Sequence, residues 1–198
     1  MDHTRKLATF CADLTYEQIP ADAVEKARCC IIDFIANVYG SLTLEPVEQT
    51  IAYIRSLNSG STASVFGAGF KTGIHTAAFA NGTLAEAVEA QDGYRFGGNH
   101  PVCGVMPAAF AAAEETGADG KTLITAVVAG YEAANRPAAA MHPWHTLSGF
   151  LPTGTCGTFG AAAAAAKIYG FDSETTLNAI ANAGYLAPLS MAEHLMGG

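Results

Sequence analysis

The sequence predicts an all-α fold, in which closely packed helices form a bundle with very little sheet. Half of the residues (50%) are hydrophobic, and along most of the chain they recur at the spacing of amphipathic helices. Alanine is abundant and glycine numbers 21, and such small side chains let helix backbones approach one another. Only residues 63–67 have a strand-like pattern. We therefore expect one helical domain over residues 1–198, long enough to bury a core.

The first half of the chain is divided by boundary signals. Residues 4–14 have a helical pattern, and the connector that follows ends at Pro20, which suits the first turn of a helix. The next apolar pattern is expected to be helical from there to Gly40. A further amphipathic pattern covers residues 46–57, and residues 59–62 predict a turn before the strand-like segment.

The second half is predicted to be helical with short connections. The expected helices cover residues 72–91, 105–116, 119–136, 155–170 and 173–187. Gly117 and Gly170 follow such patterns as C-terminal stops would, and Asp172 precedes one as an N-cap would. Glu132 and Arg136 lie four residues apart on one helix, and we interpret them as a structural pair.

The composition argues against several classes of partner. The net charge is −8 and the ten Lys and Arg residues form no basic cluster, so neither nucleic acid nor an anionic membrane is an expected partner. No stretch of about 18 residues is continuously apolar, and the N-terminal segment lacks a secretory hydrophobic region. The five cysteines have no C-x-x-C spacing, which favours reduced, mostly buried thiols without a metal. We therefore expect a cytoplasmic protein.

The candidate site is the polar segment between the helical pattern that ends near Gln91 and the one that begins after Pro107. Residues 89–101 read EAQDGYRFGGNHP. Only 14% of the chain is charged, yet two acids, an arginine, a tyrosine, an asparagine and a histidine gather here. Such a concentration on one loop favours a site for a polar ligand. The simpler alternative is an ordinary polar loop, with Gly93 as the helix stop and a solvated histidine.

The spacing within this loop predicts a cluster of ionisable groups. Glu89 and Asp92 lie three residues apart at an expected helix C-terminus, so both carboxylates can face one side. The helix dipole and their mutual repulsion there tend to raise the proton affinity of at least one. The Gly97-Gly98 pair lets the chain fold back, so we expect His100 to return towards the acids.

Two other motifs have simpler explanations. Gly154, Gly157 and Gly160 recur at every third residue, but no strand precedes them and no Gly-Lys-Ser/Thr follows, so a P-loop is excluded and close helix contact is favoured. His142 and His145 lie on a connection between helices and lack a third ligand at suitable spacing. A zinc site is therefore not expected there.

A series of short motifs runs along almost the whole chain. They are LTYEQIP (14–20), IDF (32–34), FGAG (66–69), ANGT (80–83), the segment 89–101, AGYE (129–132) and LPTGTCGTFGAA (151–162). Each is weak alone, but their order and spacing together are specific. With these motifs the chain resembles the N-terminal helical domain of the MmgE/PrpD family, which includes 2-methylcitrate dehydratase, cis-aconitate decarboxylase and iminodisuccinate epimerase.

The resemblance implies an enzyme that needs no metal or organic cofactor and acts on a small di- or tricarboxylate. Its reaction would begin by removing a proton next to a carboxylate, and would continue by loss of water, loss of carbon dioxide or return of a proton to the other face. Asp92 and His100 match site positions of the family and are the expected catalytic residues, and either His100 or a carboxylate with a raised pKa could act as the base. The residues expected to hold the substrate are Glu89, Tyr94, Arg95, Asn99 and Thr153.

Two features depart from the family pattern. Leu151 stands where many members carry a histidine, so that role is missing or is taken by a neighbour such as His145, and dehydration or epimerisation is favoured over decarboxylation. The chain's last residues, 192–198, precede the segment in which the family carries an active-site lysine and its second, α+β domain. We therefore expect a fragment or one half of a split enzyme, which forms a homo-oligomer or binds a companion chain. The alternative is a partner subunit without activity of its own.

Overall fold

The computed structural model describes residues 2–187 and confirms the all-α prediction. The helices are α1 (His3–Asp13), the 3-10 turn η1 (Tyr16–Gln18), α2 (Ala21–Ser41), α3 (Glu45–Leu57), α4 (Ile74–Glu86), α5 (Val102–Thr116), α6 (Gly120–Met141), α7 (Trp144–Leu147), α8 (Pro152–Thr155), α9 (Gly157–Ile168) and α10 (Ser173–Tyr185). Strands β1 (Ala63–Val65) and β2 (Phe70–Thr72) form an antiparallel pair.

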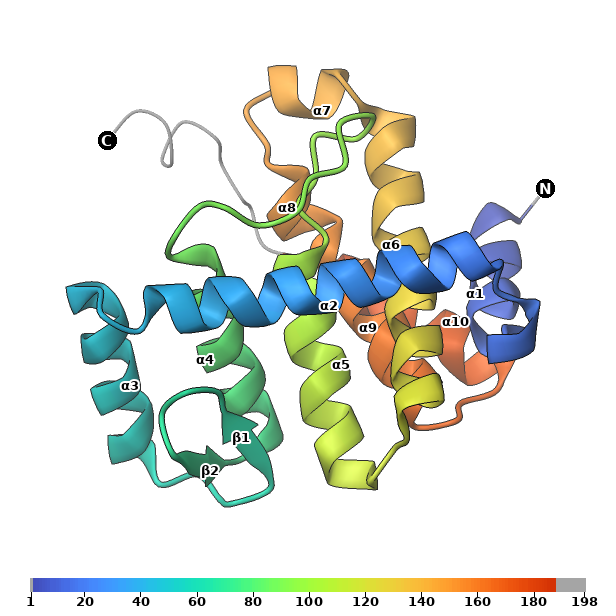
Figure 1. Cartoon of the computed structure of the whole chain (residues 1–198). Helices are drawn as coiled ribbons and strands as arrows, with labels where there is room; N and C mark the ends of the chain where they lie inside the picture. Colours follow the sequence, from blue (N-terminus) through green and yellow to red (C-terminus); the bar gives the residue numbers. More distant parts are fainter. Residues whose placement is uncertain (1, 188–198) are drawn as a thin grey trace.

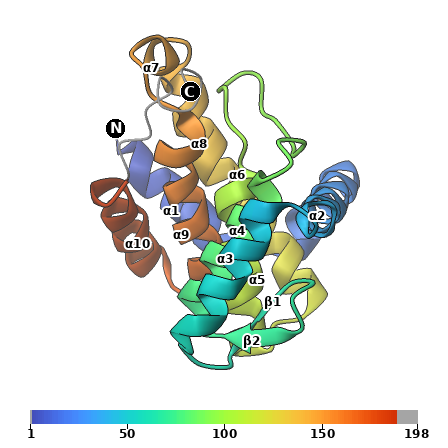
Figure 2. The same ribbon diagram turned by 90° about the vertical axis from the view of Figure 1, so that its left-hand side faces the viewer.

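The helices are arranged in layers around α5 and α6. Helix α2 lies across α4, α5 and α6 at a steep angle on one side of the bundle (Figure 1). Helix α9 packs against α5 and α6 on the other side, where α1 and α10 also contact each other (Figure 2). The core lies between these layers and includes the fully buried Phe34 of α2, Leu84 of α4, Met106 of α5 and Val127 of α6.

Glycines allow α9 to approach its neighbours closely. A Cβ atom added at Gly160 would lie 2.7 Å from the carbonyl oxygen of Gly130 on α6. One added at Gly104 of α5 would lie 2.9 Å from the carbonyl oxygen of Gly157. Both distances are shorter than a real Cβ contact, so the backbones meet here without room for a side chain. The prediction of close helix contact is confirmed for Gly160, whereas a Cβ atom added at Gly157 would have nothing within 4 Å, so the approach there depends on Gly104.

The predicted helix ends are also present. The side chains of Asp119 and Asp172 accept hydrogen bonds from the backbone N–H groups three residues further on, as N-cap residues do. Gly117 ends α5 in the left-handed conformation, with φ of 67°, and Gly170 follows α9 with φ of 68°. The aspartates pair N–H groups that a helix start leaves without a partner. The left-handed glycines turn the chain so that following N–H groups can bond the last carbonyl oxygens.

The helix predicted over residues 72–91 is shorter than expected. Thr72 belongs to β2, where it pairs with Ala63 of β1, and α4 ends at Glu86. Glu89 has φ of 52°, a left-handed conformation that cannot continue a right-handed helix. Although the alanine-rich pattern is compatible with a longer helix, the chain turns here and the backbone N–H of Asp92 donates to Asp33 on α2.

Helices α5 and α6 are longer than predicted, although each contains a proline. Helix α5 begins at Val102 and includes Pro107, and α6 continues through Pro137 to Met141. Burial of their apolar faces outweighs the one backbone hydrogen bond that each proline removes. The helix predicted over residues 155–170 corresponds to α9, and the short helices α7 and α8 were not predicted.

Within the described residues, no single helix has both the length and the apolarity to cross a membrane, although α2 and α3 meet these criteria as a pair bent by 95°. Residues 192–198, on which the expectation about the chain's end depends, lie outside the described part of the chain.

Candidate functional site

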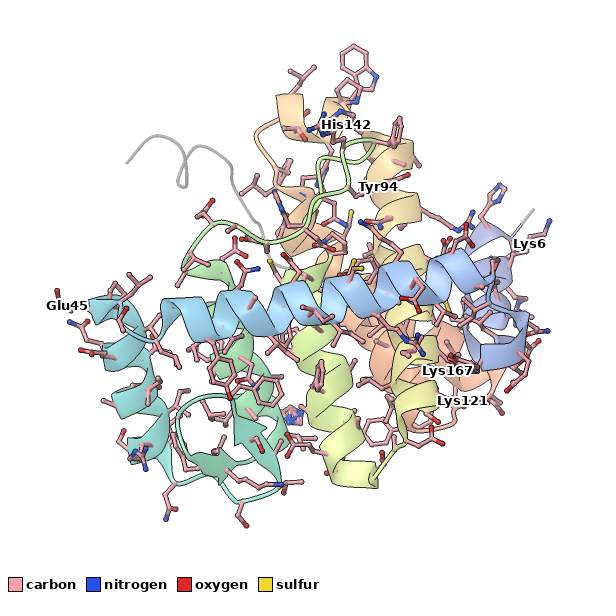
Figure 3. All side chains as sticks on the ribbon, in the orientation of Figure 1. Lys6, Glu45, Tyr94, Lys121, His142 and Lys167 are labelled. Carbon is pink, nitrogen blue, oxygen red and sulfur yellow. The ribbon has the colours of Figure 1, made fainter. Side chains whose placement is uncertain are left out.

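The predicted site segment forms a small hairpin between α4 and α5, beside α7 and α8 (Figure 1). The backbone N–H of Tyr94 donates to the carbonyl oxygen of Asn99 at 2.7 Å, and that of Gly97 donates to Tyr94 at 3.1 Å. Gly98 has φ of 59°, so the fold-back predicted at the Gly97-Gly98 pair is confirmed. Tyr94 lies at the same end of the molecule as His142, whose ring would be 3.4 Å from a Cβ atom added at Gly98 (Figure 3).

A cavity of about 840 Å³, here called the His100 cavity, lies on one side of this hairpin. Its walls come from α4, the hairpin, the start of α5, α8 and α9. Its polar side chains are Thr83, Glu86, Glu89, Gln91, His100, Cys103, Thr153 and Thr158. Leu151 and Phe79 form part of its apolar wall. Three of the predicted site residues therefore share this cavity, together with Leu151.

His100 is held from two sides. Its ring Nδ1 lies 2.6 Å from the backbone carbonyl oxygen of Asp92. Its backbone N–H donates to Oγ1 of Thr153 at 3.1 Å, which connects the hairpin to α8. A Cβ atom added at Gly93 would lie 3.6 Å from the ring, at ordinary van der Waals distance, so the imidazole packs directly against this glycine. The ring is thus oriented by its own loop while its other edge stays accessible.

The carboxylate of Asp92 lies on the other side of the hairpin. It accepts a hydrogen bond from the Tyr131 hydroxyl at 2.7 Å and a longer one from the Val102 N–H at 3.4 Å. Together with Cys30 and Asp33 of α2 it lines a second cavity of about 520 Å³, the Asp92 cavity. The side chains of Asp92 and His100 therefore line different cavities. His100 was expected to return to the acids. It does reach the main chain of Asp92, but the expectation is wrong for the Asp92 carboxylate.

The Asp92 cavity keeps its neutral donors protonated. Burial raises the pKa of the Tyr131 hydroxyl well above its usual value, and the adjacent charge of Asp92 raises it further. Burial, followed by the Asp92 charge, also raises the pKa of the Cys30 thiol to about 11. Tyr131 is therefore a permanent hydrogen-bond donor to Asp92 at neutral pH.

The acids of the His100 cavity differ from those predicted. Glu89 is exposed and lies beyond the end of α4, so the expected helical pairing of Glu89 with Asp92 is wrong. Glu86, at the last position of α4, accepts a hydrogen bond from the Cys103 thiol instead. Burial and this hydrogen bond raise the pKa of Cys103 above its usual range. Glu86 follows the ANGT motif on the same helix face, since Thr83 lies three residues before it, and this spacing could have identified it.

The other predicted residues lie away from the His100 cavity. Arg95 is exposed, and Tyr94 lines the Asp92 cavity. Asn99 is only 1% exposed, and its side-chain amide donates to Oδ1 of Asn135 at 2.8 Å. His145 has Nε2 at 2.8 Å from Oγ1 of Thr155 and stacks on a phenylalanine ring, so it points into the α7 and α8 region.

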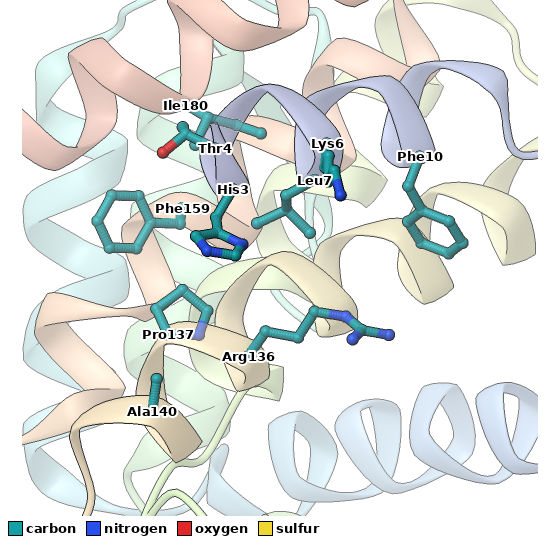
Figure 4. Close-up of a pocket in the computed structure, with 10 residues that line it drawn as sticks. All are labelled: His3, Thr4, Lys6, Leu7, Phe10, Arg136, Pro137, Ala140, Phe159 and Ile180. Atoms are coloured by element: carbon teal, nitrogen blue, oxygen red, sulfur yellow. The ribbon is translucent and has the colours of Figure 1, made fainter. Parts of the chain in front are cut away.

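A separate cavity of about 670 Å³ lies between α1, α6, α9 and α10 (Figure 4). Its walls are mostly apolar and include Leu7, Phe10 and Phe159, and none of the predicted site residues lines it. Arg136, which forms the predicted ion pair with Glu132 on α6, lies at its edge. Within the residues that the structure describes, no group of three or more His, Cys, Asp or Glu side chains is arranged to hold a metal ion. The His100 cavity is therefore the candidate site.

Comparison with known proteins agrees with this architecture. Residues 5–195 match the MmgE/PrpD N-terminal domain. The chain is 29% identical over 185 residues to the cis-aconitate decarboxylase-like protein oryM of Aspergillus oryzae, an alignment that covers 89% of this chain and 38% of that protein. It is 28% identical over 144 residues to cis-aconitate decarboxylase of Aspergillus terreus, covering 70% of this chain and 29% of that protein. The chain thus spans less than half the length of these relatives. Because the domain match extends over nearly the whole chain, the protein belongs to the MmgE/PrpD family.

Proposed function

We propose that this chain supplies the His100 cavity of a lyase or isomerase that removes a proton next to a carboxylate of a small di- or tricarboxylate. The observation that carries the proposal is the His100 ring, held through Nδ1 by a backbone carbonyl at the wall of a cavity of about 840 Å³. A histidine in such a place can accept a proton near neutral pH, as a general base must. In this proposal His100 accepts the proton from the α-carbon.

Direct contact with the substrate is proposed for the other predicted residues of the same cavity. Thr153 lies beside His100, and Glu89 is on the opposite end of the hairpin. Glu86, which also lines the cavity and lies beside Cys103, is a further candidate: in its protonated form it would give a proton to a leaving hydroxide, which departs as water. Loss of the hydroxide as water would then complete a dehydration. Return of a proton to the other face of the α-carbon would complete an epimerisation.

Leu151 bears on the choice among these reactions. It contributes an apolar wall to the His100 cavity and cannot transfer a proton. This favours dehydration or epimerisation over decarboxylation, whereas the Aspergillus relatives are named as cis-aconitate decarboxylases. The assay below therefore measures the shared first step and the release of carbon dioxide separately.

A second candidate function is that of one part of a larger enzyme. The described residues that line the His100 cavity include the acids Glu86 and Glu89 but neither lysine nor arginine. A di- or tricarboxylate brings its own negative charges, and burying these beside carboxylates without a cation is unfavourable. A companion polypeptide segment that supplies lysine or arginine would remove this conflict. In that case the chain is a partner subunit whose site is completed by another segment.

The experiment is deuterium exchange at the α-carbon of candidate di- and tricarboxylates in D2O, followed by NMR, with carbon dioxide measured in parallel. It is run with the chain alone and with a polypeptide that contains the remainder of one Aspergillus relative. Exchange by the chain alone supports the first function, and exchange that requires the second polypeptide supports the second. The absence of exchange in both mixtures would overturn both.

His100→Ala is expected to lower the exchange rate by about 10²–10⁴-fold, the usual contribution of a positioned base. His75→Ala is the matched control, since His75 is an exposed histidine on α4 and should leave the rate unchanged. Both variants should unfold at nearly the wild-type denaturant concentration, because both side chains are exposed. An unchanged rate in His100→Ala would remove His100 from the mechanism.

A further inference from the structure

Asp92 is held by groups from two helices, one through its main chain and one through its side chain. Its backbone N–H donates to Oδ2 of Asp33 on α2 at 3.1 Å. Its carboxylate accepts the hydrogen bond from Tyr131 on α6 at 2.7 Å. Its carbonyl oxygen, the remaining polar group of the residue, lies 2.6 Å from Nδ1 of His100. Asp92 is therefore anchored on the side of the Asp92 cavity and meets His100 only through its main chain.

This geometry decides which nitrogen of His100 carries the proton. A carbonyl oxygen can only accept a hydrogen bond, so Nδ1 must carry the hydrogen at this distance. In the neutral ring, Nε2 then keeps its lone pair. Within the described residues Nε2 has no hydrogen-bond partner, and the ring lines the His100 cavity. Nε2 is thus the atom available to accept a proton from a substrate.

We infer that Tyr131 and Asp33 are positioning residues that hold the Asp92 carbonyl in place and so keep His100 in its Nδ1–H tautomer, with Nε2 as the base. The inference rests on the proposed function for its meaning in catalysis, but it concerns an arrangement present in the chain itself. It also gives Asp92 a role through its main chain, since its carboxylate faces away from the His100 cavity.

The anchors suit this role because both are half-buried and lie on helices of the bundle. The Tyr131 side chain lies between α2 and the hairpin, and its raised pKa keeps the hydroxyl protonated at neutral pH. The bond from Tyr131 spans 39 positions of sequence, and the bond to Asp33 spans 59. The hairpin is therefore tied to the rigid bundle and does not depend on its own turn alone.

The test is the tautomeric state of His100, read from long-range ¹H–¹⁵N correlation spectra of the chain labelled at its histidine rings. Spectra are recorded at a pH about two units above the ordinary histidine pKa of about 6.5. His100→Gln identifies the His100 signals. We expect a protonated Nδ1 and an unprotonated Nε2 in the wild type. Tyr131→Phe, which keeps the ring and removes the hydroxyl, should shift His100 towards a mixture of both tautomers.

Tyr169→Phe is the matched control, because it also removes a tyrosine hydroxyl that donates to a carboxylate, that of Glu115, at a different place. It should leave the His100 spectrum unchanged. Asp33→Ala is a second variant, which removes the other anchor and should shift the tautomer in the same direction as Tyr131→Phe. It keeps the test possible if Tyr131→Phe does not fold. A wild-type His100 with the proton on Nε2, or an unchanged tautomer in whichever anchor variants fold, would overturn the inference. Since the spectra need no substrate, loss of the proposed function in the exchange assay would not affect this result.

Discussion

The residues of the site divide their polar groups between two cavities. Asp92 presents its carbonyl to His100 on one side and its carboxylate to Tyr131 on the other. Glu86 contacts Cys103 at the end of α4, where the fold brings a carboxylate to the wall of the His100 cavity. For these residues, the function depends on which cavity each polar group faces as much as on the residue type.

Leu151→His should change the pH dependence of turnover. The new imidazole would stand in the wall of the His100 cavity, near Glu86 and Glu89, whose negative charge should favour its protonated form. A second titrating group beside the base should therefore alter the profile of kcat against pH, and some stability should be lost because a polar ring replaces a half-buried apolar side chain. Parallel profiles of wild type and variant are the measurement. If the two coincide, position 151 lies outside the reacting centre.

The elements owe their packing to backbone contacts as well as to apolar side chains. Helix α9 meets α5 and α6 at glycines. The aromatic rings of Phe34, Phe66 and Phe110 pack together where α2, the turn between β1 and β2, and α5 meet. The rigidity of these contacts matters for the site, because α8 and α9 carry one wall of the His100 cavity and α4 and α5 carry another.

Gly160→Ala should destabilise the fold by about 1–3 kcal/mol, as overpacking of a filled core does. The added Cβ would lie 2.7 Å from both the Gly130 carbonyl oxygen and Cγ2 of Val105, and the backbone atom cannot move aside without shifting α6. Gly40→Ala is the control, since nothing lies within 4 Å of its added Cβ and alanine favours the helix by up to about 1 kcal/mol. Urea denaturation of both variants is the measurement. Equal midpoints would show that α6 and α9 are free to separate.

The N-caps of α6 and α10 make stability depend on pH in the acid range. Hydrogen bonds from Thr122 lower the pKa of Asp119, and those from Thr175 lower the pKa of Asp172. Since both folded pKa values lie below the unfolded value of about 3.9, the stabilisation is complete above that pH and is lost as the pH falls through the folded values. The double variant Asp119→Asn, Asp172→Asn keeps both caps but does not titrate there. Its free energy of unfolding should fall less steeply with acid than that of wild type, and identical slopes would contradict the assignment.

The whole molecule leaves several large apolar side chains uncovered. Ile32, Ile35 and Tyr39 are 67%, 37% and 57% exposed and lie on one stripe of α2. Trp144 and Leu147 of α7 are 74% and 71% exposed at the end of the bundle that carries the site. Apolar stripes of this kind on a folded domain typically mark surfaces that another polypeptide covers.

We therefore predict that the isolated chain self-associates, and that the association is driven by the α2 stripe. Sedimentation velocity over a range of concentrations should show dimers or larger species. Ile32→Ser, Tyr39→Ser should reduce them, because the change removes apolar area from the stripe without touching the core. Leu57→Ser, an exposed leucine at the end of α3, is the control and should have little effect. A wild-type chain that stays monomeric at every concentration would contradict the prediction.

Sequence by itself determined the features that depend on neighbouring residues. Helices follow from apolar spacing, their ends from caps such as Asp119, Asp172 and Gly117, and the fold-back of the hairpin from Gly97 and Gly98. Each of these is decided within one or two helical turns, where backbone hydrogen bonds and positive φ values act locally. The polar loop was likewise recognisable from composition alone.

Only the tertiary structure decided how the polar groups of that loop are directed. The carboxylate of Asp92 turns away from His100 because Tyr131, 39 positions later in the sequence, binds it from α6. Glu86 enters the cavity because α4 ends there and Cys103 of the next helix donates to its carboxylate. Spacing along the chain places Glu86 on one helix face with Thr83, but the partners Tyr131 and Cys103 are brought to these carboxylates only by packing.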